Sequence, residues 1–260
     1  MLVLLYLVIV LTKVTLEFSY MEQEKNIQVS ADQAFYDDEP IGSRSGHEKW
    51  MREIEFYFSS YEKRLNKSLF DTNGIVVELG AGSCGLSACL SRLANVKHVY
   101  SLDISQVRMK KMVGISSEIL GGDVTKIETI ASNFNAQLPF EDNSLDAVFF
   151  DAALHHTRSM WDLLCECNRV LKKGGLLIAQ REAYLSALRA RGQLKRLMKT
   201  PEVAASVSEN IYLFEQYEYY LRVNGFAVEF LPRTPDKIKS LLGFFNRILF
   251  CDGVLWCKKT

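Results

Sequence analysis

The 260-residue sequence lacks a net charge, because its 31 lysines and arginines balance its 31 aspartates and glutamates. A basic excess is the usual mark of a nucleic-acid-binding protein, so this balance argues against a nucleic-acid partner. Histidine is scarce, with four residues, and none of the six cysteines forms a CxxC pair. These absences argue against structural metal sites and a disulfide framework, and they favour reduced thiols in a cytoplasmic protein.

The opening of the sequence lacks an apolar run long enough to cross a membrane. Leu2–Leu11 is an unbroken apolar stretch of ten residues, whereas a membrane-spanning helix needs about 20. No basic region and no small-residue cleavage site of a signal peptide precede Glu17. We treat residues 1–20 as an apolar N-terminal extension, and three interpretations stay open: a packed strand or helix, a weak membrane-surface anchor, or an extension upstream of a natural start at Met21.

An amphipathic pattern follows in residues 21–72, which we interpret as an N-terminal helical segment. Apolar side chains recur there at spacings of three and four, at Trp50, Ile54, Tyr57, Tyr61 and Leu65. This spacing predicts one buried helix face over residues 46–66.

From residue 75 onward, strand-like and helix-like patterns alternate. Strands are predicted at 75–77, 98–103, near 118–120, 145–150, 176–180, 226–231 and 251–258. Helices are predicted at 84–94, 105–113, 158–171, 182–199, 211–223 and 236–247. The alternation predicts one α/β domain over residues 73–260, with a parallel sheet, helices on both faces and a small helical cap inserted at 182–224.

The most informative motif is VVELGAGSCG, which spans Val76–Gly85 at the end of the first predicted strand. Gly80 and Gly82 permit a sharp turn and let a ligand touch the backbone. The string also fits GxGxxG, so taken alone it leaves a dinucleotide open. Glu78 argues for another ligand, because its carboxylate would repel a pyrophosphate but attract a cationic sulfonium with a free amine.

Further carboxylates follow the other predicted strands. Asp103 ends the second strand, where its carboxylate can accept both hydroxyls of a ribose. Asp123 follows the predicted third strand, at the place of an adenine amino group, and Asp151 ends the fourth. His155 and His156 come next, and an imidazole there is suited to general base catalysis. The alternative is a structural role at the start of the next helix, and the spacing is poor for a metal.

Taken together, five motifs resemble those of the class I, seven-strand S-adenosylmethionine-dependent methyltransferases. The motifs are VVELGAGSCG, SLDIS, GGDV, LPFEDNSLDAVFFDAALHH and NRVLKKGGLLIA, and they lie between residues 74 and 180. The resemblance is strongest to the type 11 branch, which includes enzymes of ubiquinone and menaquinone biosynthesis. It implies a Rossmann-like doubly wound sheet of order 3-2-1-4-5-7-6 with strand seven antiparallel. It also implies a cofactor site made of Glu78, Gly80, Ala81, Gly82, Asp103, Ile104, Asp123, Val124 and Asp151.

The resemblance implies methyl transfer from S-adenosylmethionine to an unidentified small-molecule or lipid-linked acceptor, at oxygen or nitrogen in preference to carbon. His155 or His156 is the candidate base, and Glu182 is a weaker candidate. Two alternatives stay open: an NAD(P)-dependent oxidoreductase, and a non-catalytic relative that binds the cofactor. The sequence leaves the oligomeric state open.

Two side-chain clusters in the insertion each have two interpretations. The basic cluster is either a solvated face or a contact for an anionic acceptor or a membrane surface; it comprises Arg189, Arg191, Lys195, Arg196 and Lys199. The aromatic cluster belongs mostly to the core, with one or two members free to line an acceptor pocket; it comprises Tyr212, Phe214, Tyr217, Tyr219 and Tyr220.

Overall fold

The computed structural model describes residues 32–37, 44–68, 74–182, 184–185, 190–200, 210–232 and 253–260. The apolar extension 1–20 and the predicted helix over 236–247 lie outside these residues. None of the helices in the described ranges is long and apolar enough to cross a membrane.

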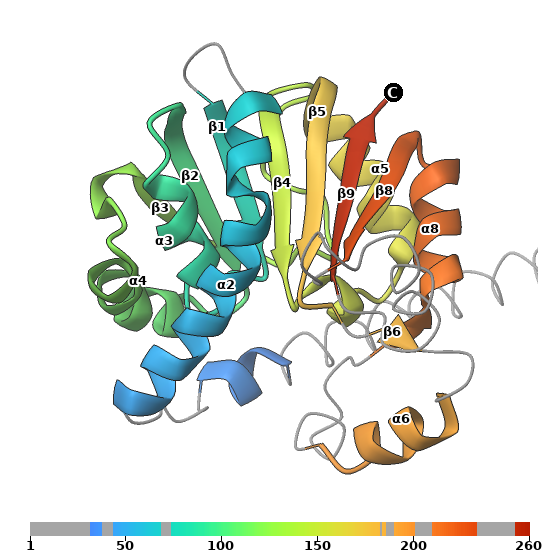
Figure 1. The fold of residues 1–260 in the computed structure, drawn as a ribbon, viewed down its shortest axis with the longest axis horizontal. Helices are drawn as coiled ribbons and strands as arrows, with labels where there is room; N and C mark the ends of the chain where they lie inside the picture. The colour runs from blue at the N-terminus through green and yellow to red at the C-terminus, as the bar shows by residue number, and fades with distance from the viewer. Residues whose placement is uncertain are drawn as a thin grey trace, which may run out of the picture.

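A seven-stranded sheet forms the centre of the molecule (Figure 1). Its strands are β1 (Gly74–Leu79), β2 (Val96–Asp103), β3 (Ile127–Ala131), β4 (Leu145–Asp151), β5 (Leu171–Gln180), β8 (Phe226–Pro232) and β9 (Gly253–Lys259). Their order is β3-β2-β1-β4-β5-β9-β8, and β9 runs antiparallel to both of its neighbours. The predicted strand order and the antiparallel seventh strand are therefore confirmed.

Helices cover both faces of the sheet. They are α2 (Arg44–Ser68), α3 (Gly85–Ser91), α4 (Gln106–Leu120), η1 (Val124–Lys126), η2 (Leu154–His156), α5 (Met160–Val170), α6 (Ala190–Leu197) and α8 (Phe214–Val223). Successive strand residues point to opposite faces. Val76 accordingly packs in a cluster with α2 and α3, whereas Val77 packs in a cluster with α5 and α8. Figure 1 shows the same two helical layers on either side of the strands.

The amphipathic helix predicted over 46–66 is confirmed as α2, which extends further at both ends. Ile54, Tyr61 and Leu65 are buried, but Trp50 is 44% exposed. Its neighbour Met51 is fully buried, so the buried stripe begins one residue later than its first predicted member. Gly85 lets α3 approach α2 closely, because a Cβ there would lie 2.5 Å from Cδ1 of Ile54.

The predicted third strand near 118–120 is wrong, because those residues are the last turn of α4. The helix continues through Gly114 and ends at Gly121, which adopts φ 67° in the left-handed region. The third strand is β3, seven residues further along the chain. Asp123 therefore precedes the third strand instead of following it.

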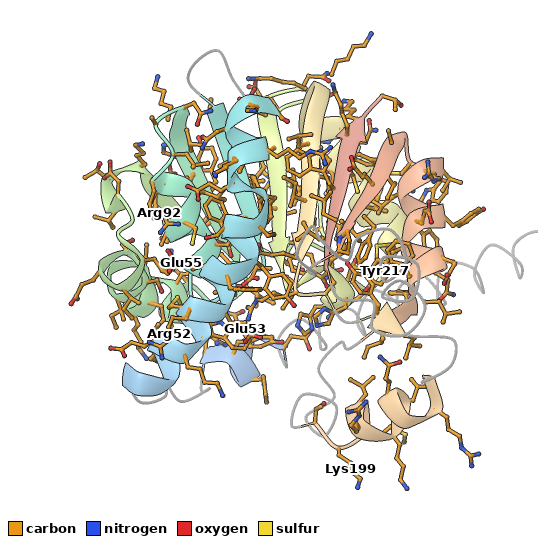
Figure 2. The ribbon with its side chains drawn as sticks, viewed as in Figure 1. Arg52, Glu53, Glu55, Arg92, Lys199 and Tyr217 are labelled. Carbon is orange, nitrogen blue, oxygen red and sulfur yellow. The ribbon has the colours of Figure 1, made fainter. Side chains whose placement is uncertain are left out.

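The insertion 182–224 also differs from its prediction. Instead of a helix over 182–199, the chain forms the short strand β6 (Tyr184–Leu185), which pairs with β7 (Tyr212–Leu213), and then α6. Tyr217 of α8 is fully buried and belongs to the hydrophobic core, and Figure 2 labels it beside this helix. The helical part of the cap is thus smaller than the pattern suggests.

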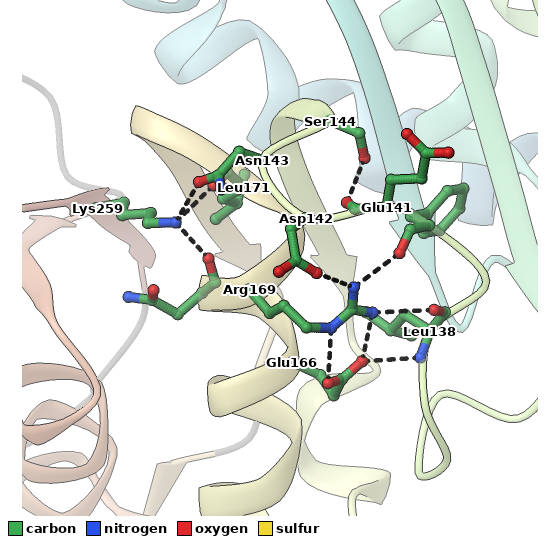
Figure 3. A network of polar contacts seen from close by, with 11 residues as sticks. Leu138, Glu141, Asp142, Asn143, Ser144, Glu166, Arg169, Leu171 and Lys259 are labelled. Carbon is green, nitrogen blue, oxygen red and sulfur yellow. Dashed lines mark hydrogen bonds and ion pairs between the residues drawn. The ribbon is translucent and has the colours of Figure 1, made fainter.

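Arg169, near the end of α5, holds the loop before β4 (Figure 3). Its guanidinium donates to Glu166 at 2.8 and 2.9 Å and to the carboxylate of Asp142 at 2.8 Å. It also donates to the carbonyl oxygens of Leu138 and Phe140, at 3.1 and 2.9 Å. One side chain therefore fixes the path of the loop.

We expect Arg169→Ala to lower the free energy of unfolding by about 1–3 kcal/mol, because several partly buried acceptors lose their donor. The control is Arg52→Ala, since Arg52 is 67% exposed and forms a 3.9 Å pair with Glu48 (Figure 2). Its effect should stay within about 0.5 kcal/mol. Urea unfolding measures both, and equal losses would contradict the role given to the loop network.

Candidate functional site

A cavity of about 310 Å³ opens at the carboxyl ends of the central strands. Its lining comes from the segments 80–83 after β1, 103–104 at the end of β2, 132–135 after β3 and 151–156 after β4. Asp32, Tyr36, Trp50 and Arg108 complete the lining. Open α/β sheets bind ligands in this crevice.

The glycine turn after β1 forms one wall of the cavity. Gly80 adopts φ 72°, and a Cβ at this residue would lie 2.6 Å from the Cβ of Ala153. Gly82 adopts φ 44° and faces open space, since a Cβ there would have Nε of Arg108 as its nearest neighbour, at 3.9 Å. The two glycines therefore serve different ends: the first permits close packing of β1 on β4, and the second keeps space at the cavity.

Asp103 links two walls of the cavity. Its carboxylate accepts hydrogen bonds from the backbone N–H groups of Gly82 and Ser105, both at 2.8 Å. Burial raises the pKa of Asp103, although these two hydrogen bonds and the charges of Arg108 and His156 oppose that rise. The carboxylate lies where the sequence predicted it, at the end of β2 and facing the cavity.

Asp151 forms an ion pair with the neighbouring Arg181. Its carboxylate accepts two hydrogen bonds from Arg181, both at 2.7 Å, and a third from Gln180 at 2.9 Å. The guanidinium of Arg181 also lies over the ring of Trp50, 4.0 Å from its centroid. Asp151 lines the cavity as predicted, but as one half of a buried ion pair.

Glu182 and His155 form a buried pair at the start of η2. The Glu182 carboxylate accepts from the backbone N–H groups of Ala153 and Leu154 at 3.0 Å, and it lies 2.7 Å from Nδ1 of His155. Burial alone would raise the pKa of Glu182, but the charge of His155 and these hydrogen bonds outweigh burial and lower it. All contacts of the Glu182 carboxylate described above are with protein groups. His155 lines the cavity, whereas Glu182 does not.

A short helical segment, residues 32–37, covers the other side of the cavity. Asp32 forms an ion pair with Arg158 at 3.2 Å, and Ser105 donates to Asp37 at 2.5 Å. The ring of Tyr36 packs edge-on against His156, with centroids 6.2 Å apart. This segment connects the β2 side of the cavity with the β4 side.

The structure does not bring Glu78 to the cavity. Its carboxylate is buried and accepts from the backbone N–H of Ser87 at 2.7 Å and from the Ser87 hydroxyl. Burial, together with the charge of Asp151, raises the pKa of Glu78 to about 8. Glu78 was predicted to face the ligand. In the structure its side chain instead accepts hydrogen bonds at the start of α3.

Asp123 and Val124 also lie away from the cavity. The exposed carboxylate of Asp123 accepts from the backbone N–H of Thr125 at 3.0 Å and caps η1. These hydrogen bonds to Thr125 lower the pKa of Asp123. The misplaced third strand explains the error, because the segment that follows β3 and reaches the cavity is 132–135.

Sequence reasoning missed part of the lining. Residues 132–135 follow the alternating string IETIA, whose β-branched residues are typical of a strand, although the third strand was predicted earlier in the chain. Arg108 and Trp50 carried no comparable signal, because each appears in the sequence as one position of a helix. Tyr36 lies in a polar stretch with no periodicity.

The described members of the two clusters of the insertion do not line the cavity. Phe214 and Tyr217 are buried in the core, as their first interpretation predicts. Arg191, Lys195, Arg196 and Lys199 are exposed, and Figure 2 shows Lys199 pointing away from the molecule. Arg189 lies outside the described residues. Within the described ranges, no group of His, Cys, Asp and Glu side chains could hold a metal ion.

The geometry defines an α/β domain with a nucleoside-cofactor type of site, made of a glycine turn after β1 and a carboxylate after β2. Residues 77–179 match the family model described as "Methyltransferase domain", of type 11. Over this segment, the chain is similar to the type 11 family of S-adenosylmethionine-dependent methyltransferases.

Three known proteins are similar to this chain. Malonyl-[acyl-carrier protein] O-methyltransferase 1 of Coxiella burnetii is 32% identical over 103 residues, which are 40% of this chain and 32% of that protein. The chain thus matches about a third of that relative's length. The structure of geranyl diphosphate C-methyltransferase of Streptomyces coelicolor A3(2) is also similar, with a TM-score of 0.61 at 15% identity. The match covers 89% of this chain and 98% of that chain.

The third similar structure is a putative methyltransferase in complex with the Trm112 activator of Haloferax volcanii. Its TM-score is 0.59 at 19% identity, and the match covers 87% of this chain and 96% of that chain. At these low sequence identities, the two solved structures show only that the fold is shared. The Coxiella and Streptomyces proteins are named for different acceptors, so the fold does not select one for this chain.

Proposed function

We propose that this protein transfers a methyl group from S-adenosylmethionine to a small-molecule or lipid-linked acceptor in the cavity, at oxygen or nitrogen. The observation that carries the proposal is the Asp103 carboxylate beside Gly82, at the cavity of a methyltransferase domain. The match to an O-methyltransferase over 103 residues supports an acceptor oxygen.

The residues around the cavity fit this cofactor. Asp103 offers carboxylate oxygens to the two ribose hydroxyls, and Gly82 leaves space because it has no side chain. The loop 132–135 contacts the adenine, in place of Asp123 and Val124, while Ile104 and Ala81 supply apolar and backbone contacts.

S-adenosylmethionine supplies an activated methyl group, and its sulfur leaves as a neutral thioether, so the protein needs no acid. The task of the chain is to align the acceptor in a dry site and, where required, to accept its proton.

Calorimetric titration with S-adenosylmethionine, S-adenosylhomocysteine and NADH tests the proposal. We expect micromolar binding of the first two and at least about a tenfold loss in Asp103→Ala, since a hydrogen bond to a charged group contributes about 1.5–3 kcal/mol. Asp123→Ala is the matched control, because that carboxylate is exposed and lies away from the cavity; its affinity should be unchanged. Binding of NADH alone would instead establish the nicotinamide-dependent oxidoreductase, and cofactor binding without turnover would establish the non-catalytic relative.

A weak membrane contact through residues 1–20 stays part of the proposal for a lipid-linked acceptor. Deleting these residues is expected to reduce co-sedimentation with anionic liposomes, because an amphiphilic surface contact scales with its apolar area. Equal co-sedimentation of the two proteins would remove the contact from the proposal.

A further inference from the structure

We infer that Glu182 and His155 form an oriented base, and that the acceptor is therefore a hydroxyl that must lose its proton. Glu182 acts through His155 as a positioning residue. The inference rests on the proposed methyl transfer and adds the chemical class of the acceptor and the identity of the base.

The first argument is how firmly His155 is held. Its ring nitrogen Nδ1 lies 2.7 Å from the Glu182 carboxylate, whose side chain is fully buried. Its backbone N–H also points to Glu182, at 3.3 Å, and its carbonyl accepts from the backbone N–H of Asn210 at 3.0 Å. Two other segments of the chain therefore hold His155, one at its ring and its backbone N–H and the other at its carbonyl oxygen, and a base positioned in this way loses little entropy when it reacts.

The second argument is the hydrogen-bonding chemistry of the pair. A carboxylate that already accepts backbone N–H bonds can only accept at Nδ1, so it keeps a proton on that nitrogen. In the neutral ring this makes Nε2 the basic nitrogen, and His155 lines the cavity. The same logic applies wherever a buried carboxylate sets the tautomer of a catalytic histidine.

The third argument separates the two histidines. The rings of His155 and His156 lie 4.2 Å apart, but only His155 contacts Glu182 within the described hydrogen bonds. His156 packs against Tyr36, and its charge acts on Asp103, which places it on the side of the ribose carboxylate. His155 is therefore assigned to the acceptor and His156 to the cofactor side.

The chemistry of the transfer then selects the acceptor. A hydroxyl transfers its proton to Nε2 of His155 while an oxygen lone pair forms the new O–CH3 bond. The C–S bond breaks, its electron pair stays on the sulfur as a neutral thioether, and the imidazolium later releases the proton to water. A neutral amine attacks with its own lone pair and gains little from such a base. A fully buried carboxylate that orients His155 as a base is useful for a hydroxyl acceptor and not for an amine, so it favours a hydroxyl.

The tautomer of His155 provides a direct test that needs no acceptor. Nitrogen-15 spectra of the protein saturated with S-adenosylhomocysteine, recorded at increasing pH until the ring of His155 loses one proton, should show that Nδ1 keeps its proton and that Nε2 loses it. Signals are assigned by their disappearance in His155→Gln. A neutral wild-type ring with its proton on Nε2 would overturn the inference, because that nitrogen could not accept a proton from the acceptor.

Glu182→Gln sharpens the test, since the geometry predicts which way the amide turns. Ala153 and Leu154 both donate to Oε1, so the amide oxygen should stay there and the NH2 group should face Nδ1 of His155. That NH2 group would donate to Nδ1 and move the ring proton to Nε2. We expect this tautomer change with S-adenosylhomocysteine affinity unchanged within about twofold, because Glu182 does not line the cavity. An unchanged tautomer would contradict the positioning role.

Turnover of matched phenols and anilines provides the second readout. We expect methylation of phenols, with kcat lowered by about 10²-fold in Glu182→Gln and in His155→Gln at an unchanged KM for the cofactor. Preferred methylation of anilines, unaffected by Glu182→Gln, would overturn the hydroxyl assignment. Failure of the wild-type protein to bind S-adenosylhomocysteine would overturn the proposed function instead, so the two failures are distinguishable.

Discussion

Gly80→Ala is expected to lower the free energy of unfolding by about 2–4 kcal/mol, because the substitution combines backbone strain with a steric overlap. Residue 80 has φ 72°, and its new Cβ would lie 2.6 Å from the Cβ of Ala153. β1 and β4 could accommodate the methyl group only by moving apart, which would also disturb the cavity. We therefore expect the loss of S-adenosylhomocysteine binding together with the loss of stability, measured by calorimetry and urea unfolding.

Gly82→Ala is the matched control for this prediction. Its φ of 44° is also in the left-handed region, but the new methyl group would meet open space. We expect a loss of stability of only about 1 kcal/mol, whereas cofactor affinity should still fall because the methyl group enters the cavity beside Asp103. Equal destabilisation by the two substitutions would show that strain alone, and not the contact with Ala153, sets the role of Gly80.

Glu78→Gln is expected to stabilise the protein in alkaline solution and to flatten the dependence of its stability on pH. The pKa of Glu78 is about 8 in the folded protein, against 4.5 for an ordinary glutamate, chiefly because of burial. Below pH 4.5 the carboxyl group is protonated in both states, so it contributes no pH dependence. As the pH rises from 4.5 to 8, the unfolded chain loses this proton and the folded chain keeps it. The free energy of unfolding should therefore fall over that range, by roughly 3–5 kcal/mol for a fully buried group.

Glutamine removes this proton linkage and keeps an amide oxygen that can accept both hydrogen bonds from Ser87. Urea unfolding at several pH values from acidic to alkaline measures the effect, with Glu78→Gln and wild type converging in acid. Glu229→Gln is a control of opposite sign, because the hydrogen bonds from Arg64 lower the pKa of Glu229. That variant should lose stability at neutral pH and not in acid. Parallel curves for Glu78→Gln and wild type would contradict the raised pKa.

The sequence allowed the central strands to be located because they are buried on both faces. β1 and β4 each contain a short apolar run, at residues 75–77 and 147–150, and the glycine turn after β1 is visible in the sequence itself. The edge strand β3 is different, since none of its five residues is fully buried. Its pattern was weak for that reason, and Gly114 inside α4 made the helix look shorter than it is.

The site was predictable where one local motif supplies both the turn and the ligand group. Asp103 and Gly82 are of this kind. The pairing of His155 with Glu182 was not, because 27 residues separate them and only the adjacency of β4 and β5 brings them together. Glu78 shows the opposite case, in which a residue that is informative for the family turns out to satisfy a backbone N–H at the start of α3.

The position of β9 between β5 and β8 has a consequence for the order of folding. β8 contacts the sheet only through β9 in the strand order, although it precedes β9 in the chain. During synthesis, β8 and α8 emerge before the strand that joins them to the sheet, so the backbone N–H and C=O groups along this edge of β5 stay unpaired until β9 arrives. Such late, non-local pairing slows folding and leaves an edge open to aggregation.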